Sequence, residues 1–212
     1  IYGYNNIEIP QSVHSTLSYA PKPDKEKIVN TVSDMLSSIG YTEIMNNSLS
    51  KAAYYQSLES YKAENCVKIL NPLSTDLNVM RQTLLFGALE TVALNTNRRN
   101  PDLKLYEFGN CYRYDATRTA EQAEKPLAPY TETYRLAVTV TGTDTPQSWQ
   151  GKAAGSSFFT LRAAVEKILR RMGVDIYSLK TSACSSDLFD EALSLEIGGK
   201  EFMQMGVVAR KI

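Results

Sequence analysis

The stretch from Asn71 to Tyr114 constrains the fold most, because it combines a turn, a helical repeat and a long alternating pattern. Pro72 fixes its own backbone and keeps the preceding residue out of the helical region, which predicts a turn. The polar residues 74–76 can cap a helix that follows. That helix should be amphipathic, because apolar residues recur at helical spacing: Leu84, Leu85, Ala88, Leu89 and Val92.

The end of this helix and the strand after it are also marked in the sequence. Arg98 and Arg99 suit the negative carbonyl end of a helix, and Asn100-Pro101 should stop it. Residues 103–114 then alternate between two faces, as a long strand does. One face would carry Leu103, Leu105, Glu107, Gly109, Cys111 and Arg113, and the other Lys104, Tyr106, Phe108, Asn110, Tyr112 and Tyr114.

The remaining patterns predict two more main helices and several strands. We expect helices at 24–39, with Asp24 as N-cap and Gly40 at the end, and from Ser156 or Ser157 to Gly173. We expect a short helix at 50–58, strands at 41–49, 66–70, 133–141 and 176–181, and loops at 115–130 and 142–155. Gly198-Gly199 predicts a two-residue hairpin turn between strands at 193–197 and 202–208. This order predicts an α+β fold, an antiparallel sheet with flanking helices.

The bulk properties limit the class of protein. The 212 residues suffice for one sizeable domain or two small ones, and a formal net charge of zero creates no overall field for nucleic acid or anionic membranes. No apolar run approaches the roughly 20 residues that cross a bilayer, and the polar start lacks a secretory signal. We expect a cytoplasmic protein cut from a longer chain, with residues 1–20 as an extended linker from a preceding domain and 21–212 as one domain.

Cysteine and histidine usage offers little catalytic chemistry. Cys66, Cys111 and Cys184 are far apart and odd in number, without metal-type spacing, so we expect free thiols in a reducing compartment. His14 is the only histidine, and its polar surroundings provide nothing that would position it as a base. Nucleotide-cradling, Walker, GxSxG and HExxH patterns are absent from the sequence.

Two other groups of residues have a structural and a functional interpretation. Asp187, Asp190 and Glu191 cluster, but a charged loop before a strand is usually a solvated face rather than a metal site. The aromatic side chains on one face of the long strand could stack on nucleic-acid bases, although such a set more often forms core or interface. It comprises Tyr106, Phe108, Tyr112 and Tyr114.

The order and spacing of several motifs identify a family resemblance. The chain resembles the beta subunit of bacterial phenylalanine–tRNA ligase, in its catalytic-like module, over essentially its whole length. The residues that carry the resemblance are Ile1 to Ile7, Asn71-Pro72-Leu73-Ser74, Met80 to Leu85, Gly87, Leu89, Asn95, Asn97-Arg98, Leu105 to Asn110, Trp149 and Phe158-Phe159.

The chain departs from the family pattern in two places. Arg162-Ala163 stands where the family commonly has Lys-Gly, and Ser185 to Phe189 replaces a His-Pro-Gly-Arg-like run. Any role of those family residues does not carry over to this chain. The acidic cluster that binds magnesium in the family would precede Ile1, so we assign no metal ligand here.

The resemblance implies a class II aminoacyl-tRNA synthetase-like fold that does not run the reaction itself. Catalysis would belong to the alpha subunit, in a heterotetramer that uses ATP and magnesium to charge the phenylalanine tRNA. Class II enzymes hold the ATP phosphates with two arginines on separate elements. Arg113, at the end of a strand before a long loop, resembles the first. The second has no counterpart in these residues, because Gly198-Gly199 predicts a hairpin turn and Arg210 follows an apolar strand.

Two main hypotheses follow. In the first, the module is a non-catalytic scaffold for the alpha subunit that helps to place tRNA, and it exposes an apolar or aromatic patch, with the aromatic strand face and the linker as candidates. In the second, a pocket around Glu107, Gly109, Cys111 and Arg113 still binds a nucleotide or an amino acid, with Glu107 and Arg113 as candidate binding residues. Direct contact of Lys and Arg side chains with RNA is a third idea. We assign no catalytic residue, and we expect no membrane contact.

Overall fold

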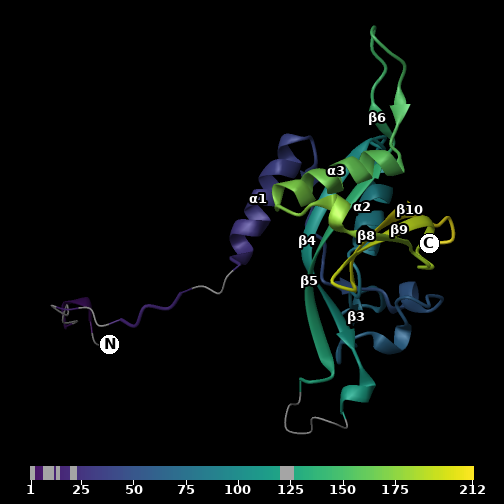
Figure 1. Ribbon diagram of the computed structural model, residues 1–212. Coiled ribbons are helices and arrows are strands. Elements are labelled where there is room, and N and C mark those ends of the chain that lie inside the picture. Colours follow the sequence, from purple (N-terminus) through teal and green to yellow (C-terminus); the bar gives the residue numbers. More distant parts are fainter. Residues whose placement is uncertain (1–2, 7–11, 13–14, 20–22, 120–126) are drawn as a thin grey trace.

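The computed structural model describes residues 3–6, 12, 15–19, 23–119 and 127–212 (Figure 1). In the region expected to be a linker, the described residues are exposed and include a short 3-10 turn at Tyr4–Asn6. His14 lies outside the described residues. Within the described ranges, no helix is long and apolar enough to cross a bilayer.

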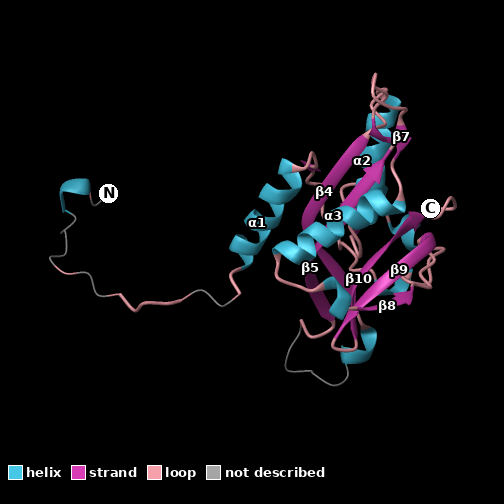
Figure 2. Ribbon diagram, turned by 45° about the horizontal axis from the view of Figure 1, so that its top comes forward, coloured by secondary structure: helices cyan, strands magenta, loops and turns pink. Residues whose placement is uncertain are grey.

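Two three-stranded sheets form the body of the molecule (Figure 2). The first has the order β1 (Thr42–Glu43), β4 (Leu103–Tyr114), β5 (Tyr130–Thr141). β4 and β5 pair antiparallel along all of their length, from Leu103↔Thr141 to Tyr114↔Tyr130, whereas β1 is parallel to β4. The strands predicted at 103–114 and 133–141 are therefore confirmed, and they pair as a long hairpin.

The second sheet has the order β10 (Lys200–Val208), β9 (Phe189–Ile197), β8 (Lys180–Ala183). Its β9–β10 turn is the predicted Gly198-Gly199 turn, since Ile197 pairs with Lys200 and both glycines have positive φ. The α+β class with flanking helices is thus confirmed, but two sheets stand where the sequence suggested one. Two small ribbons complete the strands, β2 (Leu49–Ser50) with β3 (Val79–Met80), and β6 (Thr143–Thr145) with β7 (Ala154–Gly155).

The three predicted helices are present, and their caps follow the sequence signals. α1 (Lys25–Ser38) begins at Asp24, whose carboxylate accepts hydrogen bonds from the N–H groups of Glu26 and Lys27. α3 (Phe158–Arg171) begins with a capping box between Ser157 and Thr160. α2 (Leu85–Asn97) starts at its predicted apolar residues but has no side-chain cap.

The helices place the hydrophobic core on both faces of the β4–β5 hairpin. α1 and α3 cover one face, where Val32, Leu36 and Ala164 pack against Tyr106. α3 also packs on the second sheet through Val165 and Leu169, so it joins the two sheets. A separate cluster involves α2 and the connections around it: Tyr55, Leu58, Cys66, Val79, Phe86 and Leu188.

Several short elements differ from the prediction because tertiary pairing overrides local pattern. Residues 74–76 do not cap α2, because a 3-10 turn (Thr75–Leu77) and β3 intervene. The N–H of Met80 bonds to the carbonyl of Val67, and that of Arg81 to the carbonyl of Ser48. Pairing with these distant segments of the same chain keeps the backbone before Leu85 extended, so the helix starts only there.

The other corrections concern weak strands and loops. The strand expected at 41–49 divides into β1 and β2, and residues 66–70 contribute only the bridge Lys68↔Val79. The helix expected at 50–58 is a 3-10 turn at Ala52–Tyr55 preceded by Lys51 rather than Ser50. Other 3-10 turns occupy Ala63–Asn65, Ala116–Thr119 and Ile176–Ser178. The loop expected at 142–155 contains the β6–β7 hairpin.

Candidate functional site

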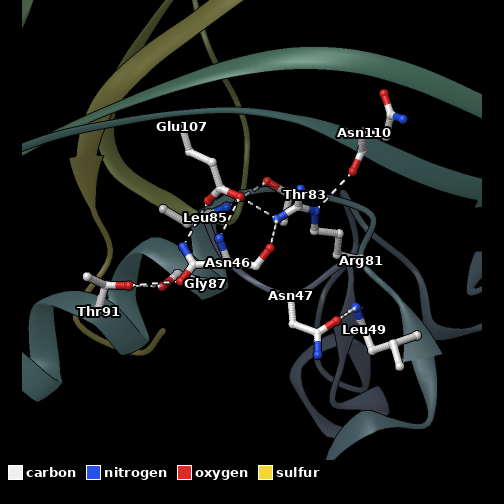
Figure 3. A network of polar contacts seen from close by, with 10 residues as sticks. All are labelled: Asn46, Asn47, Leu49, Arg81, Thr83, Leu85, Gly87, Thr91, Glu107 and Asn110. Atoms are coloured by element: carbon white, nitrogen blue, oxygen red, sulfur yellow. Dashed lines mark hydrogen bonds and ion pairs between the residues drawn. The ribbon is translucent and has the colours of Figure 1, made fainter. Parts of the chain in front are cut away.

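The face of β4 on which a ligand pocket was expected is occupied by the side chain of Arg81. Nη1 of Arg81 lies 2.6 Å from Oε1 of Glu107, and the two side chains are 8% and 1% exposed. Nε of Arg81 donates to the carbonyl of Asn110, at 2.9 Å (Figure 3). The guanidinium therefore binds both the side chain and the backbone of the strand.

The carboxylate of Glu107 is held by a second residue as well. Asn46 donates to it from its backbone N–H, at 3.1 Å, and from its side-chain amide, at 2.8 Å. Thr91 on α2 donates to the amide oxygen of Asn46, at 3.0 Å (Figure 3). The network thus joins three parts of the fold: strand β4, helix α2 and the segment that follows β1. It also provides partners for the buried carboxylate of Glu107.

Gly109 makes room for this arrangement. A Cβ atom at this position would lie 2.1 Å from Nη2 of Arg81 and 3.1 Å from Cδ2 of Leu84. The glycine therefore permits a close approach of the Arg81 side chain to the strand. Cys111, next on the same face, is buried, and burial raises the pKa of its thiol.

Arg113 lies in a different environment from Glu107, although both belong to the odd-numbered face of β4. Its side chain is exposed near the strand end, where Thr131 is its cross-strand partner. Hydrogen bonds from Thr117, and the nearby positive charge of Arg113, lower the pKa of the Asp115 carboxyl. Six residues of strand separate Glu107 from Arg113, about 20 Å at a usual rise. The structure therefore does not bring the two candidate residues together.

Two hollows in the described structure lie elsewhere. One, of about 210 Å³, is lined mainly by apolar side chains between α3 and the second sheet, including Leu193, Leu195 and Met205. The other, of about 340 Å³, is polar and includes Ser60, Ser182 and Cys184. Neither contains Glu107 or Arg113.

The aromatic face of β4 is part of the core near α1 and α3. Tyr106 is 2% exposed under α1 and α3, and its hydroxyl lies 3.2 Å from Oγ of Ser37. Phe108 is half-buried and stacks on Tyr134 of β5. The Nζ of Lys25 lies over the Tyr134 ring, 3.5 Å from its centre. The core interpretation is correct for Tyr106 and Phe108, whereas Tyr112 and Tyr114, nearer the end of the strand, are only half-buried.

The acidic cluster at the start of β9 has a structural role at one position. Asp187 accepts hydrogen bonds from the N–H groups of Glu59 and Ser60, at 2.7 and 3.2 Å, whereas Asp190 and Glu191 are exposed. Among the described residues, no three His, Cys, Asp or Glu side chains converge as metal ligands. Cys66, Cys111 and Cys184 are free thiols.

Sequence reasoning missed the Arg81–Glu107 pair and the role of Asn46. Two signals were available: Arg81 stands among residues that are otherwise mostly apolar, and Gly109 interrupts a strand of large side chains. A strand glycine often marks a close approach by another part of the protein. The partner of Glu107, however, depends on long-range packing that local patterns do not encode.

The architecture defines a class of protein. It is similar to a solved pyrrolysyl-tRNA synthetase from Desulfitobacterium hafniense, with a TM-score of 0.57 and 14% identity, covering 83% of this chain and 56% of that one. A solved ATP phosphoribosyltransferase regulatory subunit/histidyl-tRNA synthetase from Bacillus halodurans matches with a TM-score of 0.51 and 18% identity, covering 84% and 42%. The fold is therefore that of class II aminoacyl-tRNA synthetases.

The particular family follows from sequence comparison. The chain belongs to the family of the phenylalanyl-tRNA synthetase beta chain CLM domain, whose model matches residues 9–212. It is 49% identical to the phenylalanine–tRNA ligase beta subunit of Bacteroides fragilis and 38% identical to that of Porphyromonas gingivalis. Both alignments cover all of this chain and 26% of the relative, so the chain spans about a quarter of their length.

Proposed function

We propose that this chain is a non-catalytic, class II-like module of the phenylalanine–tRNA ligase beta subunit. In this proposal it scaffolds the alpha subunit and helps to place tRNA during the ATP-dependent charging of tRNA with phenylalanine in the cytoplasm. The observation that carries the non-catalytic role is the Arg81 side chain, which fills the strand face where a ligand would have to lie.

The positive charges of the module are poorly placed for activating an amino acid. Stabilising a developing charge on a phosphate requires cations aimed at it from a water-excluded site. The guanidinium of Arg81 is already paired with Glu107 at 2.6 Å. Arg113 is exposed, where water weakens its field. The Glu107 face therefore does not fit ATP, and we assign the nucleotide and its magnesium to the holoenzyme rather than to this module.

Exposed apolar side chains support the scaffolding role. Met45, Leu70 and Leu73 are 93%, 92% and 99% exposed, and Tyr177 is 88% exposed. Large apolar side chains that are this accessible are typical of surfaces that another part of an assembly covers. They come from three segments, with Leu70 and Leu73 on the same one, so they offer several contact points rather than one patch.

The outer edge of β5 offers a further contact surface. The N–H of Tyr112 bonds to the carbonyl of Arg81, so even-numbered residues of β4 direct their backbone groups away from β5. Their antiparallel partners, such as Glu132 and Tyr134, then direct theirs away from β4. In the described part of the chain no other strand pairs with this edge. Open edges of this kind readily accept another strand.

A titration tests the proposed division of labour. Full-length beta subunit, purified alone and together with the alpha subunit, is titrated with ATP and with a non-hydrolysable phenylalanyl-adenylate analogue in a calorimeter. We expect binding only when the alpha subunit is present, together with stable co-purification of the two chains. Binding by the beta subunit alone, lost in Arg113→Ala, would instead establish the nucleotide- or amino-acid-binding pocket.

A further inference from the structure

One end of the molecule combines a projecting hairpin with the C-terminus of α2. The β6–β7 hairpin extends away from the body of the protein, and the end of α2 lies at its base (Figures 1 and 2). The base is braced, because the N–H of Thr143 bonds to the carboxylate of Asp102 at 2.6 Å. Asp144 pairs with Lys104 at 2.7 Å and accepts a hydrogen bond from Thr160. The hairpin is therefore fixed to β4 and to the start of α3.

The tip of this hairpin presents a tryptophan to solvent. Ser148 and Gly151 exchange two backbone hydrogen bonds, of 3.0 and 3.3 Å, so Trp149 and Gln150 form a two-residue turn. The Trp149 side chain is 91% exposed. An indole buries more apolar surface than most side chains when it is covered, so one fully exposed on a projecting turn indicates a partner that stacks on it.

The end of α2 adds two cations, one of them in an unfavourable backbone conformation. Arg99 has a φ of 64°, and it is the one non-glycine residue with positive φ among those described. The N–H of Asn100 bonds to the carbonyl of Asn95, which closes the helix in the motif where glycine is usual at this position. An arginine there costs roughly 1 kcal/mol or more relative to glycine. This cost indicates that the Arg99 side chain has a function.

These cations have no acidic partner in the described structure. Arg98 and Arg99 are exposed, and neither belongs to any of the ion pairs found among the described residues. The two acidic residues at the base of the hairpin are engaged, since Asp102 binds the backbone of Thr143 and Asp144 binds Lys104. Lys152, just after the hairpin tip, is also exposed and outside these pairs. The arginines therefore add uncompensated positive charge at the base of the hairpin whose tip carries the exposed tryptophan.

We propose that Arg98, Arg99, Trp149 and Lys152 form a contact site for RNA. Guanidinium groups bind phosphates in a bidentate manner, and an exposed indole stacks on an unpaired base. The hairpin spans about six residues from base to tip, or roughly 20 Å, which is long enough to follow several nucleotides. The inference rests on the proposed function, because it assigns to this corner the placement of tRNA. An acidic protein surface would also attract the arginines, but RNA combines phosphates for the guanidinium groups with unpaired bases for the indole, so it fits both kinds of side chain.

The test uses ligase assembled from the alpha subunit and full-length beta subunit. Binding of a phenylalanine tRNA transcript is measured at several salt concentrations for Arg98→Ala/Arg99→Gly and for Trp149→Ala. We expect each variant to bind about tenfold more weakly. The arginine variant should also reduce the magnitude of the slope of log affinity against log salt by about 1.4, and the tryptophan variant should leave that slope unchanged.

Matched variants separate RNA contact from folding. Arg99→Gly places glycine where φ is positive, so it should raise the melting temperature while weakening RNA binding. Trp149→Phe keeps a ring for stacking and should retain most of the affinity. Arg170→Ala/Arg171→Ala removes an exposed pair from the last turn of α3, and it should bind RNA as the wild type does.

The outcomes also separate this inference from the proposed function. Wild-type affinity in both corner variants would overturn the RNA site while leaving the scaffolding role intact. Loss of the alpha subunit from the corner variants during purification would overturn it too, because the corner would then contact protein. Failure of the wild-type beta subunit to retain the alpha subunit would instead refute the proposed function.

Discussion

Arg81 and Glu107 form a buried ion pair, with 2.6 Å between Nη1 and Oε1, on the odd-numbered face of β4. The pair holds the segment after β3 against the strand, and Asn46 extends it to α2 through Thr91. The face on which we had expected a possible ligand pocket is thus closed by the protein's own side chain.

Breaking this pair should be costly. Glu107→Gln keeps the shape of the side chain but leaves Arg81 buried without its counter-ion, so we expect a loss of about 3–5 kcal/mol in the free energy of unfolding. Lys180→Met, which breaks an exposed pair with Glu196, should cost less than about 1 kcal/mol. Urea unfolding followed by circular dichroism measures both. Equal effects of the two substitutions would show that the buried pair has no special weight.

Gly109 should tolerate no side chain. In Gly109→Ala the new Cβ would meet Nη2 of Arg81, and displacing the guanidinium should destabilise the protein by roughly 1–3 kcal/mol or more. Gly151→Ala is the control, because a Cβ there meets no atom within 4 Å and φ is not positive. We expect it to change the unfolding midpoint little. A stable Gly109→Ala protein with Arg81 still paired in its crystal structure would refute the close-packing argument.

Asp187 should make the free energy of unfolding depend on pH. Partial burial acts to raise the pKa of its carboxyl, but hydrogen bonds from Ser60 and from the N–H of Glu59 outweigh it and hold the pKa below 3.8. A lowered folded-state pKa stabilises the protein above about pH 4, and this stabilisation disappears as the pH falls toward the folded-state pKa. Asp187→Asn should therefore be less stable than wild type by about 1 kcal/mol at pH 7.

The pH series provides the control for this prediction. The difference between wild type and Asp187→Asn, measured by urea unfolding, should shrink steadily between pH 5 and pH 3. A difference that stays constant over this range would mean that the charge of the carboxylate does not matter.

The three cysteines should differ in reactivity. Burial raises the pKa of the Cys66 and Cys111 thiols, so little thiolate forms near neutral pH, and access is also restricted. Cys184 is only half-buried and lines the polar hollow. Iodoacetamide at pH 8, followed by mass spectrometry, should label Cys184 well before the other two. Unfolding in urea should make all three react alike. Rapid labelling of Cys111 in the folded protein would contradict the packing of the Glu107 face.

The sequence predicts the regular parts of the fold because they depend on local chemistry. The caps at Asp24 and Ser157, the alternation of β4 and the glycine turn of β9–β10 are each encoded within a few residues. The start of α2 could not be predicted in this way, since pairing of Met80 and Arg81 with distant segments keeps the chain extended. The environment of Glu107 could not be predicted for the same reason, because its partners come from the distant positions 46 and 81.

The measurement that tests the central claim most directly is phenylalanine-dependent exchange of pyrophosphate into ATP. It is made on ligase assembled with wild-type beta subunit and with beta Arg113→Ala, the variant of the one arginine in this module that resembles a phosphate-binding residue. If the module is a non-catalytic scaffold, kcat and KM for ATP and phenylalanine should be unchanged within about twofold. A fall in kcat/KM of about 100-fold or more, with the alpha subunit still bound, would show that this module takes part in catalysis.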